Sequence, residues 1–290
     1  MFVLIITDVV DIDRFVANAR VVSLSRRAPA ASTTQAAASA ASSSSPGLDL
    51  VLDETIMHPQ GGGQPSDVGF IQWDAQPERR FTVVDVRADK GAAAVVHHYG
   101  SFGSQDLDDA ALATASAGAP VTIHVDESKR RLHARLHSAG HLLDSAVRNL
   151  GHTGLVPSKG YHFPDGPNVE YLGELEQTVR DGLPAALNIE LQRLIATGGD
   201  VQVKYVPTST LEGGGSGHSL AAPSAVPAQE TSEPLRYDSP DAVRMVNIGG
   251  VECPCGGTHV KSIGDLQNVK VTKVKRAKGT LKVYYEVSPM

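Results

Sequence analysis

The sequence has few of the residues that mark secreted or membrane proteins. Its 290 residues include only two cysteines, Cys253 and Cys255, and a single proline separates them, so they are poor candidates for a disulfide with each other. We therefore expect a reducing, cytoplasmic setting. No apolar run approaches the roughly eighteen residues that a membrane helix needs, so no membrane span or membrane partner is expected.

The chain also lacks an excess of positive charge. Lys and Arg total 26 and Asp and Glu total 32, which gives a formal net charge of −6. This balance argues against a protein that coats nucleic acid without specificity. Two local basic patches remain, at Lys129, Arg130, Arg131 and Arg135 and at Lys270, Lys273, Lys275, Arg276, Lys278 and Lys282. Either patch could bind phosphate or form an ordinary solvated face.

The first part of the chain has the pattern of a small β module. Short runs typical of strands, with turn residues between them, occur at Ala19–Leu24, Leu48–Leu52, Phe81–Val86, Ala93–His98 and Val121–Val125. We predict that residues 1–125 form a small β-barrel-like module. An Ala- and Ser-rich stretch at about 27–47 is predicted to be a disordered insertion in a hairpin, and residues 61–69 a glycine-rich loop.

The second part, residues 126–290, is predicted to be an α+β domain with an antiparallel sheet. A helix should follow Asp126 and end at Gly151, since leucines recur between them at helical spacing. Further helices are expected at Leu172–Gly182 and Leu183–Thr197, and a mobile loop at about 208–236. Strands are expected at Val201–Val206, Val243–Ile248, Val269–Lys275 and Leu281–Val287. The predicted fold class is therefore α+β.

Two short motifs carry side chains that bind metals. His137-Ser-Ala-Gly-His141 places two imidazoles four residues apart, on one face of the first predicted helix. Cys255-Gly-Gly-Thr-His259 adds a thiol and a third imidazole, and its two glycines permit a tight turn. Three imidazoles and one thiolate suit zinc better than magnesium or calcium. The sequence therefore predicts one zinc ion held by His137, His141, Cys255 and His259.

Two neighbouring residues compete for places in this ligand set. Cys253 is a second thiol, which we interpret as a small buried residue. His133 extends the helical series to HxxxHxxxH, but a fifth ligand would be one too many for tetrahedral zinc. We therefore expect His133 to be exposed or to face phosphate.

Four separated segments resemble one family in the same order. Residues 135–143, around the paired histidines, and residues 255–260 resemble the metal site in the editing domain of alanyl-tRNA synthetase. Residues 52–69, with their run of three glycines, and residues 159–171, beginning Lys-Gly-Tyr-His-Phe, resemble its free-standing relatives, the AlaX proteins. The resemblance covers about residues 50–287 outside the 208–236 loop. His58 stands where this family often carries an aromatic residue.

The resemblance implies a stand-alone editing hydrolase without a synthetase catalytic domain. Such a protein deacylates tRNA(Ala) mischarged with serine, and in some members with glycine, by zinc-dependent ester hydrolysis. Its partner is the acceptor end of tRNA(Ala), and its cofactor is one Zn²⁺ per chain. The resemblance also places the glycine-rich loop beside the zinc pocket. The candidate catalytic residues are then Gln64, Asp67, His137 and His141.

The candidate substrate-binding residues fall into two groups. Backbone N–H groups of Gly61, Gly62 and Gly63 could approach the substrate closely, although a tight structural turn explains the same glycines. Phosphates of the acceptor stem could be contacted by basic side chains at Lys159, Lys273, Lys275 and Arg276.

The ligand count raises a question about mechanism. Four protein ligands close a zinc site, whereas catalytic zinc usually keeps an open position. Zinc could therefore organise the amino-acid end of the substrate rather than activate water. The alternative function is a non-catalytic tRNA-binding protein with a structural zinc.

Overall fold

A computed structural model of the chain divides into two compact units. The barrel unit comprises Met1–Thr7, Arg14–Pro59 and Ser66–Asp126, and the C-terminal unit comprises Asp8–Asp13, Gln60–Pro65 and Glu127–Met290. The structure describes residues 5–6, 11–27, 47–89, 95–103, 117–208, 242–277 and 279–288. Most of the predicted insertion at 27–47 and of the predicted loop at 208–236 lies outside these residues. The predicted domain boundary between residues 125 and 126 stays a prediction.

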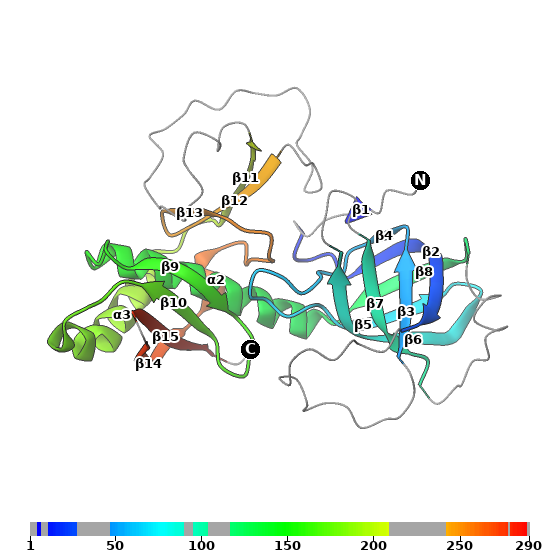
Figure 1. Ribbon diagram of the computed structural model, residues 1–290. Coiled ribbons are helices and arrows are strands. Elements are labelled where there is room, and N and C mark those ends of the chain that lie inside the picture. Colours follow the sequence, from blue (N-terminus) through cyan, green and yellow to red (C-terminus); the bar gives the residue numbers. More distant parts are fainter. Residues whose placement is uncertain are drawn as a thin grey trace. The chain divides into compact units, whose positions relative to one another are not determined.

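Six antiparallel strands of the barrel unit close into a barrel in the order β2-β3-β7-β6-β5-β8, which confirms the predicted β-barrel-like module (Figure 1). Their bounds are Val16–Arg26 (β2), Leu48–Leu52 (β3), Gly69–Trp73 (β5), Gln76–Ala88 (β6), Val96–Ser101 (β7) and Pro120–Val125 (β8). The short strands β1 (Ile5–Ile6) and β4 (Glu54–Thr55) pair in parallel. Side chains alternate between the barrel interior and solvent, as the period of a strand requires.

In its described residues the C-terminal unit combines two α-helices with two antiparallel sheets. Its elements are α2 (Glu127–Asn149), β9 (Val156–Tyr161), β10 (Asn168–Leu172), α3 (Gln177–Thr197), β11 (Gln202–Pro207), β12 (Ala242–Ile248), β13 (Val251–Pro254), the 3₁₀ helix η2 (Ile263–Leu266), β14 (Val269–Ala277) and β15 (Thr280–Val287). The four-stranded sheet has the order β14-β15-β10-β9, and the three-stranded sheet the order β11-β12-β13. The predicted α+β class is therefore confirmed.

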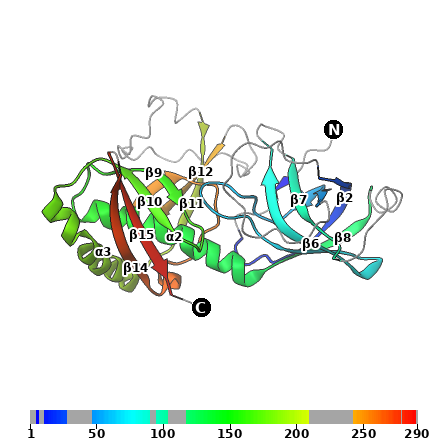
Figure 2. The ribbon, with the colours of Figure 1, turned by 60° about the horizontal axis from the view of Figure 1, so that its bottom comes forward.

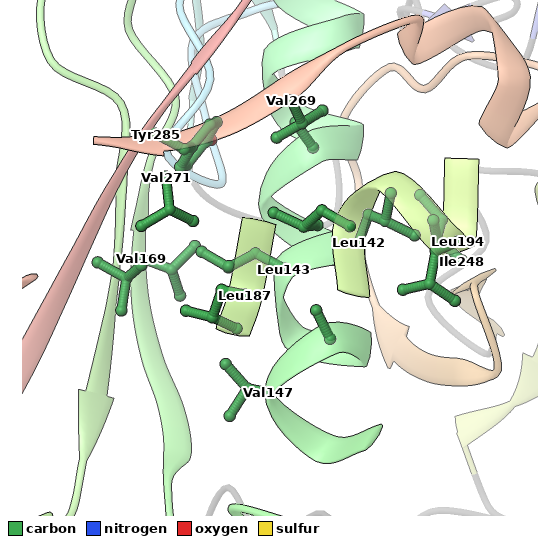
Figure 3. Packing of buried hydrophobic residues seen from close by; sticks show 14 of the residues in the cluster. Leu142, Leu143, Val147, Val169, Leu187, Leu194, Ile248, Val269, Val271 and Tyr285 are labelled. Carbon is green, nitrogen blue, oxygen red and sulfur yellow. The ribbon is translucent and has the colours of Figure 1, made fainter. Parts of the chain in front are cut away.

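Helices α2 and α3 lie against the four-stranded sheet (Figure 2). Leu142 and Leu143 of α2 and Leu187 of α3 are fully buried, and they pack with Val169 and Val271 of the sheet (Figure 3). Burying a leucine side chain contributes roughly 1.5–3 kcal/mol, so these contacts fix α2 firmly. The rigid α2 is the element that carries the paired histidines.

One predicted boundary in this unit is wrong. Residues 177–197 form a single helix, whereas two helices meeting at Gly182 and Leu183 were predicted, and Leu172 ends strand β10. Pro184 lies inside α3 without ending it. The stripe of buried leucines at 183, 187, 191 and 194 runs through this point, and its packing outweighs the low helix propensity of glycine and proline. Neither helix in the described part of the chain has the length and apolar character needed to cross a membrane.

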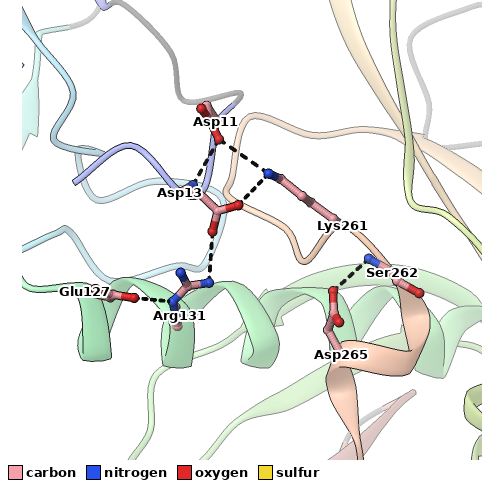
Figure 4. Close-up of polar contacts among 7 residues, drawn as sticks. All are labelled: Asp11, Asp13, Glu127, Arg131, Lys261, Ser262 and Asp265. Atoms are coloured by element: carbon pink, nitrogen blue, oxygen red, sulfur yellow. Dashed lines mark hydrogen bonds and ion pairs between the residues drawn. The ribbon is translucent and has the colours of Figure 1, made fainter. Parts of the chain in front are cut away.

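A polar network near the start of α2 holds the segment that follows His259 (Figure 4). Asp13 accepts from Lys261 and forms an ion pair with Arg131 at 3.0 Å, and Arg131 also contacts Glu127 at 2.8 Å. The hydrogen bond from Lys261 and the charges of both partners lower the pKa of Asp13. Each pair is largely exposed and therefore contributes little alone, but together they give this segment a defined position.

Candidate metal centre

Helix α2 places His137 and His141 one turn apart. Their rings are stacked, with centroids 5.0 Å apart and an angle of 20° between the planes. This is the consequence of a four-residue spacing on an α-helix, where side chains at i and i+4 lie one above the other. His137 is buried and His141 is half-buried.

The second half of the cluster lies in the loop after β13. Arg244 of β12 holds this loop, because its guanidinium donates to the carbonyl oxygens of Cys255 at 2.6 Å and Gly257 at 3.0 Å. A Cβ atom at position 257 would lie 2.1 Å from Cε1 of His137 and 2.8 Å from Oε1 of Gln64. Glycine is therefore required there for the loop to approach the helix.

The four predicted ligands come together. One donor atom from each of His137, His141, Cys255 and His259 lies within 4.8 Å of all the others. Sγ of Cys255 is 3.4 Å from Nε2 of His137 and 3.2 Å from Nε2 of His259. Tetrahedral zinc, with bonds of about 2.3 Å to sulfur and about 2.0 Å to nitrogen, separates such atoms by about 3.5 Å. The cluster could therefore hold one metal ion.

Each histidine has a partner for its other ring nitrogen. Nδ1 of His137 lies 2.7 Å from Oε1 of Gln64 and donates to it, because an amide oxygen only accepts. Nδ1 of His259 lies 3.1 Å from Oγ of Ser138. Nδ1 of His141 lies 3.2 Å from Sγ of Cys253. Such partners fix ring orientation and tautomer in metal sites, and they leave Nε2 as the ligand atom.

The electrostatics of the cluster also fit a cation. Nε2 of His141 is buried and has no hydrogen-bond partner within the described part of the chain. Burial, with a smaller effect of the Arg244 charge, lowers the pKa of His141 to about 4, so its ring is neutral and able to coordinate. Burial raises the pKa of the Cys255 thiol, opposed by the N–H of Gly257 and by Arg244. A bound cation would favour the thiolate.

Cys253 is a near neighbour of the cluster but not a member of it. Its thiol contacts the ring of His141, and burial raises its pKa to about 12. Sequence reasoning missed this contact, and it also missed the role of Ser138. Ser138 follows His137 directly and accepts a hydrogen bond from the N–H of Val260, so it links α2 to the Cys255 loop.

The glycine-rich segment contributes Gln64 to the C-terminal unit. Gly61 and Gln64 form a tight turn through two backbone hydrogen bonds, and Gly62 and Gly63 adopt positive φ angles of 56° and 79°. The turn positions the Gln64 amide, which accepts from the N–H of Thr258 at 3.0 Å as well as from His137. Its Nε2 donates to Oγ1 of Thr258. Gln64 therefore orients the metal-binding loop.

Asp67 belongs to the barrel unit. It is fully buried, and its carboxylate accepts a hydrogen bond from the N–H of His58 at 2.6 Å. A catalytic role for Asp67 stays a prediction. His98, which had no predicted role, is a buried structural residue of the barrel. Its Nδ1 donates to the carbonyl of Leu50, and its Nε2 accepts from Thr55.

His162, to which the sequence assigned no role, packs against the cluster. It is buried, and its ring stacks on that of His137 with centroids 4.5 Å apart. The hydroxyl of Tyr285 donates to the carbonyl of Leu136 at 2.9 Å, so it accepts from Nδ1 of His162 at 2.6 Å. Burial, with a smaller effect of His141, lowers the pKa of His162 to about 3. The ring is therefore a neutral wall of the site.

Glycines from three motifs make room for this ring. A Cβ atom at Gly140 would lie 2.4 Å from Cε1 of His162, and one at Gly160 would lie 2.3 Å from its Nε2. A Cβ atom at Gly63 would lie 3.3 Å from its Cδ2, and the carbonyl of Gly63 accepts from the N–H of His162 at 2.8 Å. Gly63, Gly140 and Gly160, which lie in three separate motifs, were thus a signal in the sequence that a large side chain packs between these motifs.

The first basic patch does not form an exposed phosphate site as a whole. Arg130 and Arg135 are buried, and Arg135 donates to the carbonyls of Leu266 and Ser288. His133 is also buried, so its predicted exposure is wrong. The predicted phosphate contacts Lys159, Lys273, Lys275 and Arg276 all lie on the four-stranded sheet, on β9 and β14.

Comparison with known proteins connects the C-terminal part of this chain to tRNA synthetases. Residues 243–284, which include Cys255 and His259, match the family described as the threonyl and alanyl tRNA synthetase second additional domain. This match covers β12, β13, β14 and most of β15, together with the loop that supplies half of the metal cluster.

Longer similarity extends to alanine–tRNA ligases. The chain is 29% identical to the ligase of Methanobrevibacter smithii over 239 residues, 28% identical to that of Neisseria gonorrhoeae over 235, and 26% identical to that of Pyrobaculum aerophilum over 243. These matches cover 77–78% of this chain but 22% of each ligase. The chain is therefore homologous to about a fifth of the length of these ligases.

Proposed function

We propose that this protein is a trans-editing hydrolase that deacylates mischarged tRNA(Ala), with Ser-tRNA(Ala) as its principal substrate and Gly-tRNA(Ala) as a second. One observation carries the proposal: four metal-binding side chains converge in a chain homologous to part of alanine–tRNA ligase. The motifs that resemble editing domains supply these four residues and Gln64 beside them.

The chemistry of alanine selection explains why such an activity is needed. Glycine is smaller than alanine and enters any pocket that admits alanine. Serine adds one hydroxyl, which an apolar pocket rejects only by about a hundredfold. A second site that hydrolyses the wrong ester corrects both errors. In the proposed reaction water attacks the carbonyl carbon of the ester and the bond to the ribose oxygen breaks, which releases the free amino acid and restores the hydroxyl of the terminal ribose.

The residues of the site have distinct parts in this reaction. We assign zinc to His137, His141, Cys255 and His259, where it supplies a positive charge at the amino-acid end of the substrate. Gln64 holds the His137 ring by accepting from Nδ1, and the buried ring of His162 forms one wall of the site. The backbone N–H groups of Gly62 and Gly63 are the proposed donors to the substrate, since that of Gly61 donates to the carbonyl of Gln64 within the turn.

A deacylation assay tests this proposal. Purified protein is incubated with tRNA(Ala) carrying serine, glycine or alanine, and the remaining ester is measured over time. We expect rapid loss of serine, some loss of glycine and survival of alanine. His141→Ala should abolish turnover. Lys204→Ala is the control and should leave turnover unchanged, since Lys204 is an exposed residue of β11 that pairs with Glu252. Equal hydrolysis of all three esters, or of none, would refute editing.

The closed ligand set favours one alternative. Four protein donors complete a tetrahedral shell, which is the arrangement of structural zinc. A non-catalytic tRNA-binding protein would bind tRNA(Ala) and lose stability without zinc, yet leave the serine ester intact in the same assay. The assay therefore separates the two functions.

A further inference from the structure

The four-stranded sheet presents one face to α2 and α3 and the opposite face away from them (Figures 1 and 2). Val169, Val283 and Tyr285 are buried on the helix side. Strand alternation turns their neighbours to the opposite side, which we call the outer face. Residues on this face fall into rows across the sheet, because adjacent strands are in register.

Two of these rows are basic and aromatic. Register aligns Lys275 with Lys282, Lys282 with Glu170, and Glu170 with Lys159. The next row aligns Lys273 with Tyr284, Tyr284 with Asn168, and Asn168 with Tyr161. The predicted phosphate contacts on β14 and β9, the two edges of the sheet, thus belong to one surface.

The charges of this surface are only partly neutralised. Glu170 pairs with Lys282 at 3.0 Å, and Glu286 pairs with Lys270 at 3.6 Å. No carboxylate within the described residues pairs with Lys159, Lys273 or Lys275, and all three are exposed. Three lysines without an ion-pair partner are therefore spread over the width of the outer face, against one such carboxylate among the described residues there, Asp165, which accepts from the hydroxyl of Tyr161 at 2.9 Å.

Aromatic rings lie among these lysines. Tyr161 is 39% exposed, and its ring stacks on Phe163 with centroids 4.7 Å apart. Tyr284 is half-buried, and Nζ of Lys273 lies 4.4 Å from its ring centroid. Basic side chains that follow a phosphate backbone and rings on which unpaired bases stack are the two features of proteins that bind single-stranded nucleic acid.

The edge strand β9 connects this surface to the metal centre. Tyr161 points to the outer face, and the next residue, His162, points to the other side and stacks on His137. Within the described residues β9 is an edge strand, and the glycine-rich turn covers its end, where the carbonyl of Gly63 accepts from the N–H of His162. A nucleotide stacked on Tyr161 would therefore lie one residue along the chain from the ring that stacks on His137.

We propose that the outer face binds the unpaired 3′ end of an RNA, with phosphates on Lys159, Lys273 and Lys275 and bases stacked on Tyr161 and Tyr284. That this RNA is tRNA(Ala) rests on the proposed function. An acidic protein segment is disfavoured, because it would use the lysines and leave the aromatic rings without a role.

Fluorescence anisotropy with a labelled, uncharged RNA hairpin tests the surface without any hydrolysis. The hairpin carries an unpaired 3′ end, and a second hairpin with a blunt end shows what the unpaired nucleotides add. The variants are Tyr161→Ala, Tyr161→Phe, and the combined change of Lys159, Lys273 and Lys275 to Ala. Lys204→Ala is the control, since Lys204 is an exposed lysine of the other sheet in the same unit.

The proposal predicts a specific pattern of affinities. Tyr161→Ala should weaken binding of the overhanging hairpin about tenfold, with Tyr161→Phe and Lys204→Ala close to the unaltered protein. The triple variant should reduce the salt dependence, the slope of log K against log salt, by about two. Restoring charge with arginine at the three positions should restore the slope.

Other results would overturn the surface. If Tyr161→Ala and the triple lysine variant both bind RNA with unaltered affinity, the outer face is not the RNA-binding surface, even if the unaltered protein hydrolyses the seryl ester. Equal competition by poly-glutamate and by RNA indicates an acidic protein partner instead. If the variants lose RNA binding as predicted but the unaltered protein hydrolyses no ester, the surface stands and the editing proposal fails.

Discussion

Replacing Gln64 with methionine tests whether this residue orients the metal cluster or contacts substrate. Methionine has a similar length but lacks the amide. The change removes the acceptor for Nδ1 of His137 at 2.7 Å and for the N–H of Thr258 at 3.0 Å. It also removes the donor to Oγ1 of Thr258.

The size of the effect follows from burial. Gln64, His137 and Thr258 are all buried, so water does not readily replace the lost partner. Each of the two buried donors left without an acceptor costs about 1–3 kcal/mol, so we expect the free energy of unfolding to fall by about 2–6 kcal/mol. Loss of a group that orients a metal-binding histidine typically weakens metal affinity about 10–100-fold.

Zinc affinity is measured by competition with a chromophoric chelator, and stability by urea unfolding. Gln64→Glu is the matched control. Its carboxylate still accepts from both donors and makes the His137 ring a stronger ligand, so zinc binding should be equal or tighter. If Gln64→Met binds zinc normally and loses only hydrolysis, Gln64 acts on the substrate and the positioning role is wrong.

Three further predictions concern stability. Lowering pH from 6.5 to about 4 should reduce the urea midpoint, because burial lowers the pKa of His98 to about 4 and only the unfolded chain takes up its proton. His98 should account for about 3 kcal/mol of the loss in the free energy of unfolding over this pH range. In His98→Gln that part of the loss should be absent, and a pH profile equal to that of the unaltered protein would refute the role of His98. Gly140→Ala should destabilise the protein, because the added Cβ atom would clash with His162. Gly182→Ala, in open space on α3, should stabilise it by about 1 kcal/mol. Equal effects of the two changes on stability would contradict the close packing of His162 against Gly140. Leu187→Ala should cost about 2–5 kcal/mol in urea unfolding, and a cost below 1 kcal/mol would show that α3 is loosely packed.

The metal-binding residues were predictable because they lie in short motifs. A helix fixes the relation of His137 to His141, and a five-residue turn fixes that of Cys255 to His259. Each motif could therefore be recognised from its local sequence. Because each supplies only two ligands and tetrahedral zinc needs four, the two motifs were predicted to lie together. The groups that orient these side chains were not predictable in this way, since Cys253 and Ser138 reach the rings only through tertiary packing.

The elements of the fold show the same limit. Strand β3 was predicted with its observed bounds, because four of its five residues are large and apolar and turn residues lie next to it. Strand β9 was missed, since its sequence VPSKGY has few large apolar residues and is held by pairing with β10. Arg135 was predicted to lie on the surface as part of a basic patch. The sequence does not reveal that its buried guanidinium donates to the backbone carbonyls of Leu266 and Ser288.

Hydrolysis of Ser-tRNA(Ala) by zinc-free and zinc-restored protein tests the central claim most directly. The protein is stripped with a chelator, its folding is confirmed by circular dichroism, and the loss of the seryl ester is followed before and after one equivalent of zinc is returned. We expect no hydrolysis by the stripped protein, full hydrolysis once zinc is restored, and no hydrolysis by Cys255→Ser at either stage. Rapid hydrolysis by folded, zinc-free protein would contradict the claim, and so would an inert protein with zinc bound.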